Sequence, residues 1–287
     1  MSSIIDKHNR INQLKCPKII FAGGSNLAFG LDSELIEREF NVPVVNLGLH
    51  AGLGLDFIFN ELKDVVHQND IVILSIEYFL DNEGYYDLKR FTGSKFKEAK
   101  LYYKFDIRKE IITDIDKTRM DLKSYNIKEI PNTEKGIYSR NAFNNYGDHI
   151  AHLEQDLPKK LGDRGSFKYK YWDGIKIIND FYDYVKFKNV TVYFIYPNYP
   201  KSEYLRNNTV INKLAIDLSR NLNIDILNNP SDFVFEDSLF FDTVYHLNKN
   251  GRKKRTQKLI EIINQNQNAI NKIISIKNDS LEKLNNY

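Results

Sequence analysis

An order of apolar run, turn and helix occurs three times in the first 80 residues. The runs are Lys18–Ala22, Val42–Leu47 and Ile71–Ile76. The third is almost entirely apolar, which is typical of a strand that is covered on both faces of its sheet. Short strands that alternate with helices predict a parallel sheet with right-handed crossovers.

The same alternation resumes in the C-terminal half of the chain. Apolar residues recur there at helical spacing, between two more short apolar runs. The predicted strands are Val190–Ile195 and Ile224–Leu227, and the predicted helices of the whole chain are Leu31–Phe40, Phe57–Gln68, Ile175–Tyr184, Val210–Asn221 and Asn248–Gln265. We therefore expect an α/β protein of flavodoxin-like, three-layer α/β/α type, with a central parallel sheet of about five strands and a helical insertion.

A chain of 287 residues is long enough for one large domain, and we expect residues 1–287 to form it. Between 81 and 180 charged and aromatic residues alternate without clear periodicity. This stretch is too long for a loop, so it is predicted to be an insertion over the active-site edge of the sheet, with a turn at Asn132–Gly136. Residues 266–287 are predicted to form a tail helix that packs on the domain or makes an oligomer contact.

Charge and composition exclude several classes of protein. Lys and Arg number 41 against 38 Asp and Glu, and this near balance argues against a nucleic-acid partner. No run of roughly 18 apolar residues occurs, and Met1–Lys18 lacks a signal-peptide core, so we expect no stable membrane insertion and a cytoplasmic protein. Cys16 is the only cysteine, which excludes an intramolecular disulfide and a Cys-based zinc site. We expect its thiol to be buried and unreactive.

A glycine turn that ends in serine follows the first predicted strand. Gly23 and Gly24 permit a sharp turn, which places Ser25 at the start of a helix on the carboxyl edge of the sheet. Amide groups at such a position can stabilise an oxyanion, so the turn fits a nucleophilic serine. Small-residue turns also bind phosphate in other α/β folds. The chain has neither a P-loop nor Gly-x-Gly-x-x-Gly, which disfavours a nucleotide-binding protein.

A nucleophilic serine needs a base, and the base needs a carboxylate that orients it. Asp242 and His246 lie between the last predicted strand and the last helix, where both can face Ser25. In this interpretation Asp242 holds the imidazole in one tautomer and His246 accepts the serine proton. The alternative is that His246 only packs against the final helix.

Three blocks of the sequence together resemble the SGNH (GDSL-like) hydrolase superfamily. They are the Gly-Gly-Ser turn, Asn46-x-Gly48 after the second strand, and the Asp/His pair before the last helix. The resemblance implies that Ser25 is the nucleophile and that its own backbone N–H and that of Gly48 stabilise the oxyanion. It implies His246 as the base and Asp242 as its orienting partner. It covers the first three strands and the C-terminal third, but not the insertion.

The chain departs from the family pattern at three places. Gly24 stands where the family commonly has Asp, at a position with no chemical role. The third block, usually Gly-x-Asn-Asp with Asn as an oxyanion donor, is Ser75–Tyr78 here and contains no Asn. We expect Asn26, Asn198 or a main-chain N–H to take over as donor. The spacing from Asp242 to His246 is one residue longer than usual.

The form Asp-x-x-x-His-Leu-Asn, followed by Gly251, is similar to the branch of this superfamily that acts on bacterial surface polysaccharides and teichoic acids. This resemblance implies an acyl-ester hydrolase or O-acyltransferase that acts on an O-acylated carbohydrate or small-molecule ester. Nothing marks a coenzyme A site, and we expect no cofactor. The alternative is a non-catalytic glycan-binding or scaffolding protein that retains the fold, which the missing third-block Asn favours.

Other residues give weaker signals. His50, just past the second glycine turn, and Glu77, at the end of the third strand, are candidates for the pocket wall. His149 and His152 share a possible helix face and could hold a metal, but no third ligand follows at a fitting spacing, so no metal site is expected. The basic run Lys249–Arg255 is interpreted as the solvated face of the last helix.

Overall fold

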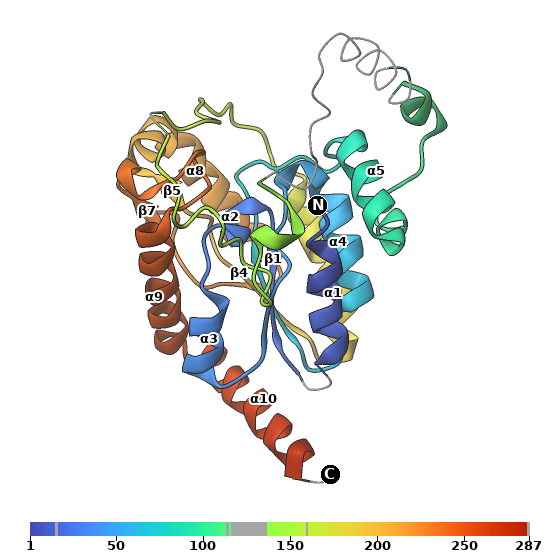
Figure 1. The fold of residues 1–287 in the computed structure, drawn as a ribbon. Coiled ribbons are helices and arrows are strands. Elements are labelled where there is room, and N and C mark those ends of the chain that lie inside the picture. The colour runs from blue at the N-terminus through green and yellow to red at the C-terminus, as the bar shows by residue number, and fades with distance from the viewer. Residues whose placement is uncertain (15–16, 113–114, 116–136, 159, 286–287) are drawn as a thin grey trace.

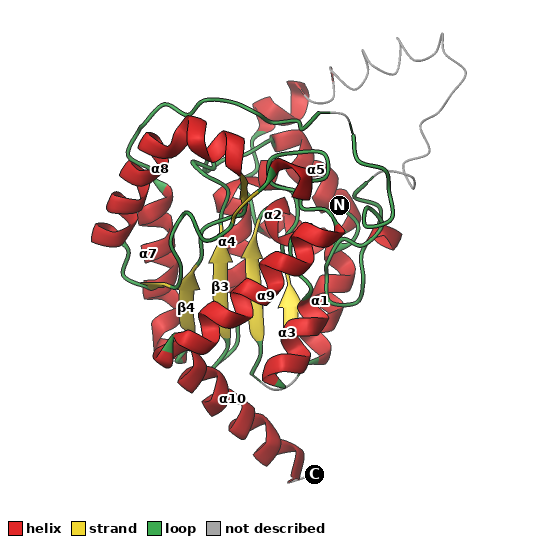
Figure 2. Ribbon diagram, turned by 90° about the vertical axis from the view of Figure 1, so that its left-hand side faces the viewer, coloured by secondary structure: helices red, strands yellow, loops and turns green. Residues whose placement is uncertain are grey.

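The computed structural model describes residues 1–14, 17–112, 115, 137–158 and 160–285. It contains a five-stranded parallel sheet in the order β2-β1-β3-β4-β6 (Figures 1 and 2). The strands are β1 (Ile19–Gly23), β2 (Val44–Asn46), β3 (Ile71–Ser75), β4 (Thr191–Phe194) and β6 (Asp225–Ile226). Counted within this sheet, the order is second, first, third, fourth, fifth, which is the doubly wound order of flavodoxin-like folds. The predicted fold class is confirmed.

The bounds of the helices follow the apolar spacing of the sequence. The helices are α1 (Ile4–Gln13), α2 (Ser25–Ala28), α3 (Ser33–Phe40), α4 (Gly54–Val65), α5 (Tyr86–Lys95), α7 (Gly174–Val185), α8 (Lys201–Asn221), α9 (Lys249–Gln265) and α10 (Gln267–Asn285). Short 3₁₀ helices are η1 (Ala51–Leu53), η2 (Lys97–Leu101), η4 (Arg140–Ala142), η5 (Lys186–Lys188) and η6 (Asp237–Leu239). The segment 81–180 therefore contains α5, η2, η4 and the start of α7.

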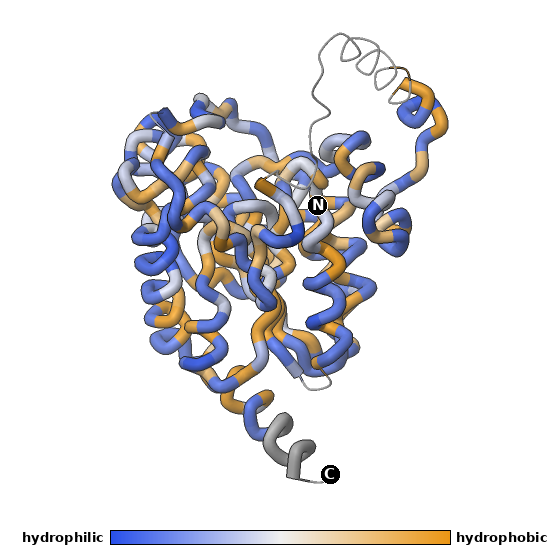
Figure 3. Tube along the Cα trace, viewed as in Figure 1, coloured by the Kyte–Doolittle hydropathy of each residue, from blue (hydrophilic) through white to orange (hydrophobic). Residues whose placement is uncertain are grey.

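Two hydrophobic clusters cover the two faces of the sheet. Along β1 the side chains alternate, because Ile20 and Ala22 join one cluster while Ile19 and Phe21 join the other. The first cluster includes residues of α1, α4, α7 and α8, and the second includes residues of α3, α9 and α10. Figure 3 shows the central strands as the most continuous apolar part of the tube. The chain therefore has helical layers on both faces, as the fully buried β1 and β3 require.

The structure differs from the predicted elements at several places. Helix α1 was not predicted, because its apolar residues are few and lie among charges. Helix α8 begins at Lys201, nine residues before the predicted start, since its first half is polar. A separate two-stranded parallel sheet joins β5 (Tyr199–Pro200) to β7 (Val234–Phe235). The predicted turn at 132–136 and Cys16 lie outside the described residues.

Helix α10 extends away from the body of the molecule at the C-terminal end (Figure 1). Its first half packs into the second cluster through Ala269, Ile273 and Ile276. Residues 266–287 thus include a tail helix, and an oligomer contact through it stays a prediction. Over the described part of the chain, no helix is both long enough and apolar enough to cross a membrane.

Helix α1 holds the loop after β2 through a buried lysine. The Lys7 ammonium donates hydrogen bonds to the carbonyl oxygens of Asn46 (2.7 Å), Gly48 (2.9 Å) and Gly147 (2.5 Å). Burial lowers the pKa of Lys7 to about 7, and the charges of Asp148 and Glu61 only partly oppose this effect. One side chain therefore fixes two loops that meet at the carboxyl end of the sheet.

We expect Lys7→Met to lower the free energy of unfolding by about 3 kcal/mol, because three buried carbonyls lose their donor. Urea unfolding followed by circular dichroism measures the change. Asn9→Ala is the matched control, since Asn9 is an exposed residue of the same helix. Equal stability of Lys7→Met and the control would show that the buried lysine does not hold the two loops.

Candidate active site

Ser25 is the first residue of α2, directly beyond β1. The turn brings the chain so close to β3 that a Cβ at Gly23 would overlap the Ser75 carbonyl oxygen, so only glycine fits there. The Ser25 side chain is largely buried, with 7% of its surface exposed. Its backbone N–H, at the first helical position, has no hydrogen-bond partner among the described residues. Ser25 therefore stands at the edge of the sheet beside a free amide donor.

Asp242 and His246 form a hydrogen-bonded pair on the loop between η6 and α9. Asp242 Oδ1 lies 2.6 Å from His246 Nδ1. The extra residue between them is accommodated by a tight loop, closed by the hydrogen bond from Phe241 N to His246 O (2.7 Å). Desolvation raises the pKa of Asp242, but the hydrogen bond and charge of His246 outweigh it, so the net pKa is lowered. An ionised Asp242 that accepts from Nδ1–H leaves Nε2 of His246 as the basic nitrogen.

Phe29 connects the serine turn to the imidazole. Its backbone N–H donates to the carbonyl oxygen of Ser25 (3.0 Å). Its ring stacks on the ring of His246, with centroids 3.8 Å apart and planes 6° apart. The ring of His149 also stacks on the ring of Phe29, with centroids 4.1 Å apart. The helix that carries the serine therefore also sets the plane of the imidazole.

Tyr138 lies over Ser25 and was not predicted. Burial raises the pKa of Tyr138 above its ordinary value, and the neighbouring Ser25 hydroxyl opposes this effect. Within the described residues no hydrogen bond joins Ser25 to His246. The Tyr138 ring packs 5.2 Å from that of His50, and the pKa of His50 is lowered by burial and then by the charge of His246. His50 and Tyr138 thus form one wall of the site.

The predicted oxyanion donor Gly48 is held by Asn46. The Gly48 N–H donates to Asn46 Oδ1 (2.9 Å), while Asn46 Nδ2 donates to Leu27 O (3.0 Å) and to Asp148 Oδ1 (2.8 Å). A Cβ at Gly48 would overlap Leu27, so the loop packs directly on α2. Asn46 and Gly48 therefore fix the loop after β2 against the serine turn. The Gly48 N–H already has an acceptor in Asn46 Oδ1.

The side-chain amides of Asn26 and Asn198 are also occupied. Asn26 Nδ2 donates to Ser75 O (2.9 Å), and Asn198 Nδ2 donates to Tyr245 O (2.9 Å). Their carbonyl oxygens accept from the guanidinium of Arg255. Each amide nitrogen thus donates one hydrogen bond inside the protein and keeps a second N–H, so the expectation that one of these amides replaces the missing Asn stays a prediction.

Arg255 is fully buried beneath the serine turn. Its guanidinium donates to Asn26 O (2.5 Å), Asn26 Oδ1 (2.9 Å), Asn198 Oδ1 (2.7 Å) and Ser75 Oγ (3.1 Å). Burial lowers its pKa to about 9, opposed by the charge of Glu77. The interpretation of Lys249–Arg255 as a solvated face is therefore wrong at Arg255, and also at the largely buried Arg252, which pairs with Asp148 (3.1 Å).

Glu77 lies two residues beyond the end of β3, next to the serine turn. Its Oε1 accepts from the backbone N–H of Asn26 (2.9 Å), and its Oε2 is buried with no hydrogen-bond partner. Both oxygens lie against Gly24, where any Cβ would overlap them. Burial raises the pKa of Glu77. The side chain predicted as a pocket wall thus lies directly beside the serine turn.

His149 and His152 face each other and not a shared metal position. Their Nδ1 atoms are 2.7 Å apart, and their Nε2 atoms lie at the carbonyl oxygens of Ile137 (2.6 Å) and Leu247 (2.9 Å). Burial lowers the pKa of His149 to about 4 and that of His152 to about 3. All four ring nitrogens are therefore engaged, and the metal interpretation of this pair is wrong. The described part of the chain holds no group of three or more metal-ligand side chains.

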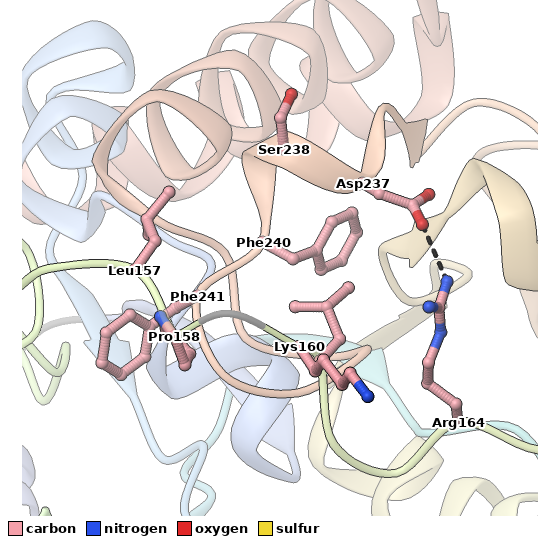
Figure 4. A pocket seen from close by; sticks show the side chains of 9 residues that line it. Leu157, Pro158, Lys160, Arg164, Asp237, Ser238, Phe240 and Phe241 are labelled. Atoms are coloured by element: carbon pink, nitrogen blue, oxygen red, sulfur yellow. Dashed lines mark hydrogen bonds and ion pairs between the residues drawn. The ribbon is translucent and has the colours of Figure 1, made fainter.

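A pocket of about 240 Å³ lies behind the Asp242–His246 loop (Figure 4). On one side Arg164 pairs with Asp237 (2.9 Å), as the dashed line shows. The pocket is lined by Leu157, Pro158, Lys160, Leu161, Arg164, Asp237, Ser238, Phe240 and Phe241. Phe241 of this lining directly precedes Asp242, but none of the predicted site residues lines the pocket.

No protein-family model matches the chain, and no curated protein matches it either.

We expect Arg255→Met to lower the free energy of unfolding by about 3 kcal/mol or more, because four hydrogen bonds from a charged donor are lost. Chemical denaturation measures this difference. Lys254→Met is the matched control, since Lys254 is the exposed neighbour on the same helix. A loss no larger than that of Lys254→Met would contradict a structural role for the guanidinium.

Proposed function

We propose that this chain is a serine-dependent acyl-ester hydrolase or O-acyltransferase. The observation that carries the proposal is the hydrogen bond between Asp242 Oδ1 and His246 Nδ1 (2.6 Å). The imidazole of His246 stacks on the ring of Phe29, and the backbone N–H of Phe29 donates to the carbonyl oxygen of Ser25, the candidate nucleophile. A half-buried carboxylate that orients a buried imidazole near a serine at a helix start is the arrangement that acyl transfer needs. In the absence of substrate, the bond between nucleophile and base is often not formed, so its absence here is compatible with the proposal.

In the first half of the reaction, Ser25 Oγ attacks the ester carbonyl carbon while His246 Nε2 accepts the hydroxyl proton. Asp242 stabilises the resulting imidazolium, and the free N–H of Ser25 faces the developing oxyanion. The tetrahedral intermediate collapses to an acyl-serine, and His246 returns the proton to the leaving alcohol. In the second half, water or a sugar hydroxyl takes the place of that alcohol, with the same base.

We propose an O-acylated carbohydrate as the substrate, and the modification of surface polysaccharide as the biological role. The resemblance of the Asp-x-x-x-His-Leu-Asn block supports this choice. The wall made by Tyr138 and His50 also supports it, since aromatic faces pack well against the apolar faces of sugar rings. Hydrolysis and transfer use the same residues, and the acceptor decides between them.

A second candidate is a non-catalytic glycan-binding protein that retains the fold. The specific observation in its favour is that the Gly48 N–H already donates to Asn46 and that no hydrogen bond joins Ser25 to His246 among the described residues. Such a protein binds sugar at the same place but does not form an acyl-serine. Reaction of Ser25 with a fluorophosphonate separates the two candidates, because the reagent requires an activated serine.

We expect Ser25→Ala and His246→Ala each to lower kcat/KM for p-nitrophenyl acetate and for an acetylated sugar by at least about 10³-fold, since each removes a member of one catalytic unit. Circular dichroism checks that both variants fold. Ser231→Ala, an exposed serine outside the site, is the control and should match the wild type.

Wild-type protein that neither hydrolyses these esters nor reacts with a fluorophosphonate would favour the non-catalytic candidate. Labelling of Ser25 without hydrolysis would instead favour a transferase with a strict donor.

A further inference from the structure

Glu77 is brought to the serine turn by the register of two strands. β1 and β3 are parallel, with Gly23 opposite Ser75, so residues just beyond them meet at the same edge of the sheet. Gly24 has no side chain, and the Glu77 carboxyl group fills the space that a Cβ would occupy. Gly24 is therefore required at its position, because any larger residue would overlap the Glu77 side chain.

The Glu77 carboxyl group has one hydrogen bond and one orphaned oxygen. Oε1 accepts from Asn26 N–H (2.9 Å), whereas Oε2 is buried without any partner in the described structure. Only 4% of the residue's surface is exposed. A buried ionised carboxylate needs a cation or several donors, and leaving one oxygen unpaired is costly. A protonated carboxyl is the state that fits, with Oε2 as the O–H.

Four titratable groups face Glu77 from the elements around it. They are His246 before α9, Arg255 on α9, Tyr138 and Tyr245. Arg255 directs its hydrogen bonds to Asn26, Asn198 and Ser75 and makes no ion pair with Glu77. Arg255 and His246 influence Glu77 only at a distance, and desolvation, the largest effect, raises the pKa of Glu77.

We propose that protonated Glu77 is the second oxyanion donor of this site, giving the O–H of Oε2 as a hydrogen bond to the oxyanion formed on Ser25. This inference rests on the proposed function. Asn26 Nδ2, Asn198 Nδ2 and the Gly48 N–H each already donate to an acceptor inside the protein, whereas the Ser25 N–H and Glu77 Oε2 have no hydrogen-bond partner among the described residues. The proton stays on Glu77 throughout, so the step adds only a hydrogen bond. A carboxylic acid kept neutral by an apolar site is a known oxyanion donor.

The pH dependence follows from the sign of the pKa shift. Below its raised pKa Glu77 carries the donor hydrogen, and above it the ionised carboxylate repels the oxyanion. Activity that depends on this donor is therefore lost as the pH rises through the folded-state pKa, which lies above the ordinary 4.5 of Glu. A glutamine at position 77 keeps an –NH₂ donor of the same shape and does not titrate.

The test compares Glu77→Ala, Glu77→Gln and the wild type over roughly pH 5 to 9, by kcat/KM for p-nitrophenyl acetate. We expect Glu77→Ala to lose about 10²–10³-fold, as the removal of one oxyanion donor does, and Glu77→Gln to retain activity within about tenfold. We also expect the decline at high pH to be absent from Glu77→Gln. Glu236→Gln, an exposed residue, is the control. Full activity of Glu77→Ala, loss in Glu77→Gln equal to that in Glu77→Ala with the fold intact, or an unchanged high-pH decline in Glu77→Gln would each overturn the proposal.

A second measurement does not depend on activity. Infrared difference spectra of wild type and Glu77→Gln at neutral pH should reveal the carbonyl stretch of one protonated carboxyl that the variant lacks. Absence of that band overturns the assignment of Glu77 even if Ser25 reacts with a fluorophosphonate. Presence of the band in a protein that neither reacts nor hydrolyses esters would refute the proposed function while upholding the protonated state of Glu77.

Discussion

The buried guanidinium of Arg255 is the interaction on which the arrangement at the carboxyl edge depends. It joins helix α9, late in the chain, to Ser75 at the end of β3 and to Asn198 beyond β4. It also holds both the backbone and the side chain of Asn26, the residue after Ser25. The serine turn therefore keeps this geometry only when helix α9 is packed against the sheet.

Polar groups on the opposite side of the turn act in the same way. Asp148 is fully buried and accepts hydrogen bonds from Ser33, Asn46 and Arg252, so it links α3, the end of β2 and α9. Lys7 binds the carbonyl oxygens of the loop after β2 from α1. The apolar clusters fix the layers of the domain, but these buried charges fix the loops. A buried charge with several partners specifies one loop conformation, because every alternative leaves it unpaired.

The sequence allowed the sheet to be predicted because strand and helix periodicities are local. The order of the strands followed from the alternation of strands and helices, and the edge to which Ser25 and the Asp/His pair belong followed from the parallel direction. The side-chain partners could not be read in this way. Arg255 looks like one cation in a basic helical run, and only its position three residues after Arg252, on the inward face, hints at burial. Tyr138 has no local signal, since it reaches Ser25 across more than a hundred residues.

The identity of a residue at this edge depends on its neighbour across the strands. Glu77 fits beside β1 only because Gly24 lacks a side chain, and Gly24 is tolerated because the Glu77 carboxyl group fills the space it leaves. The two residues therefore depend on each other, and neither can be changed alone without disturbing the packing. A sequence comparison that scores each position separately misses this dependence. Together, Gly24 and Glu77 place a buried carboxyl group next to the serine turn, and one of its oxygens has no hydrogen-bond partner among the described residues.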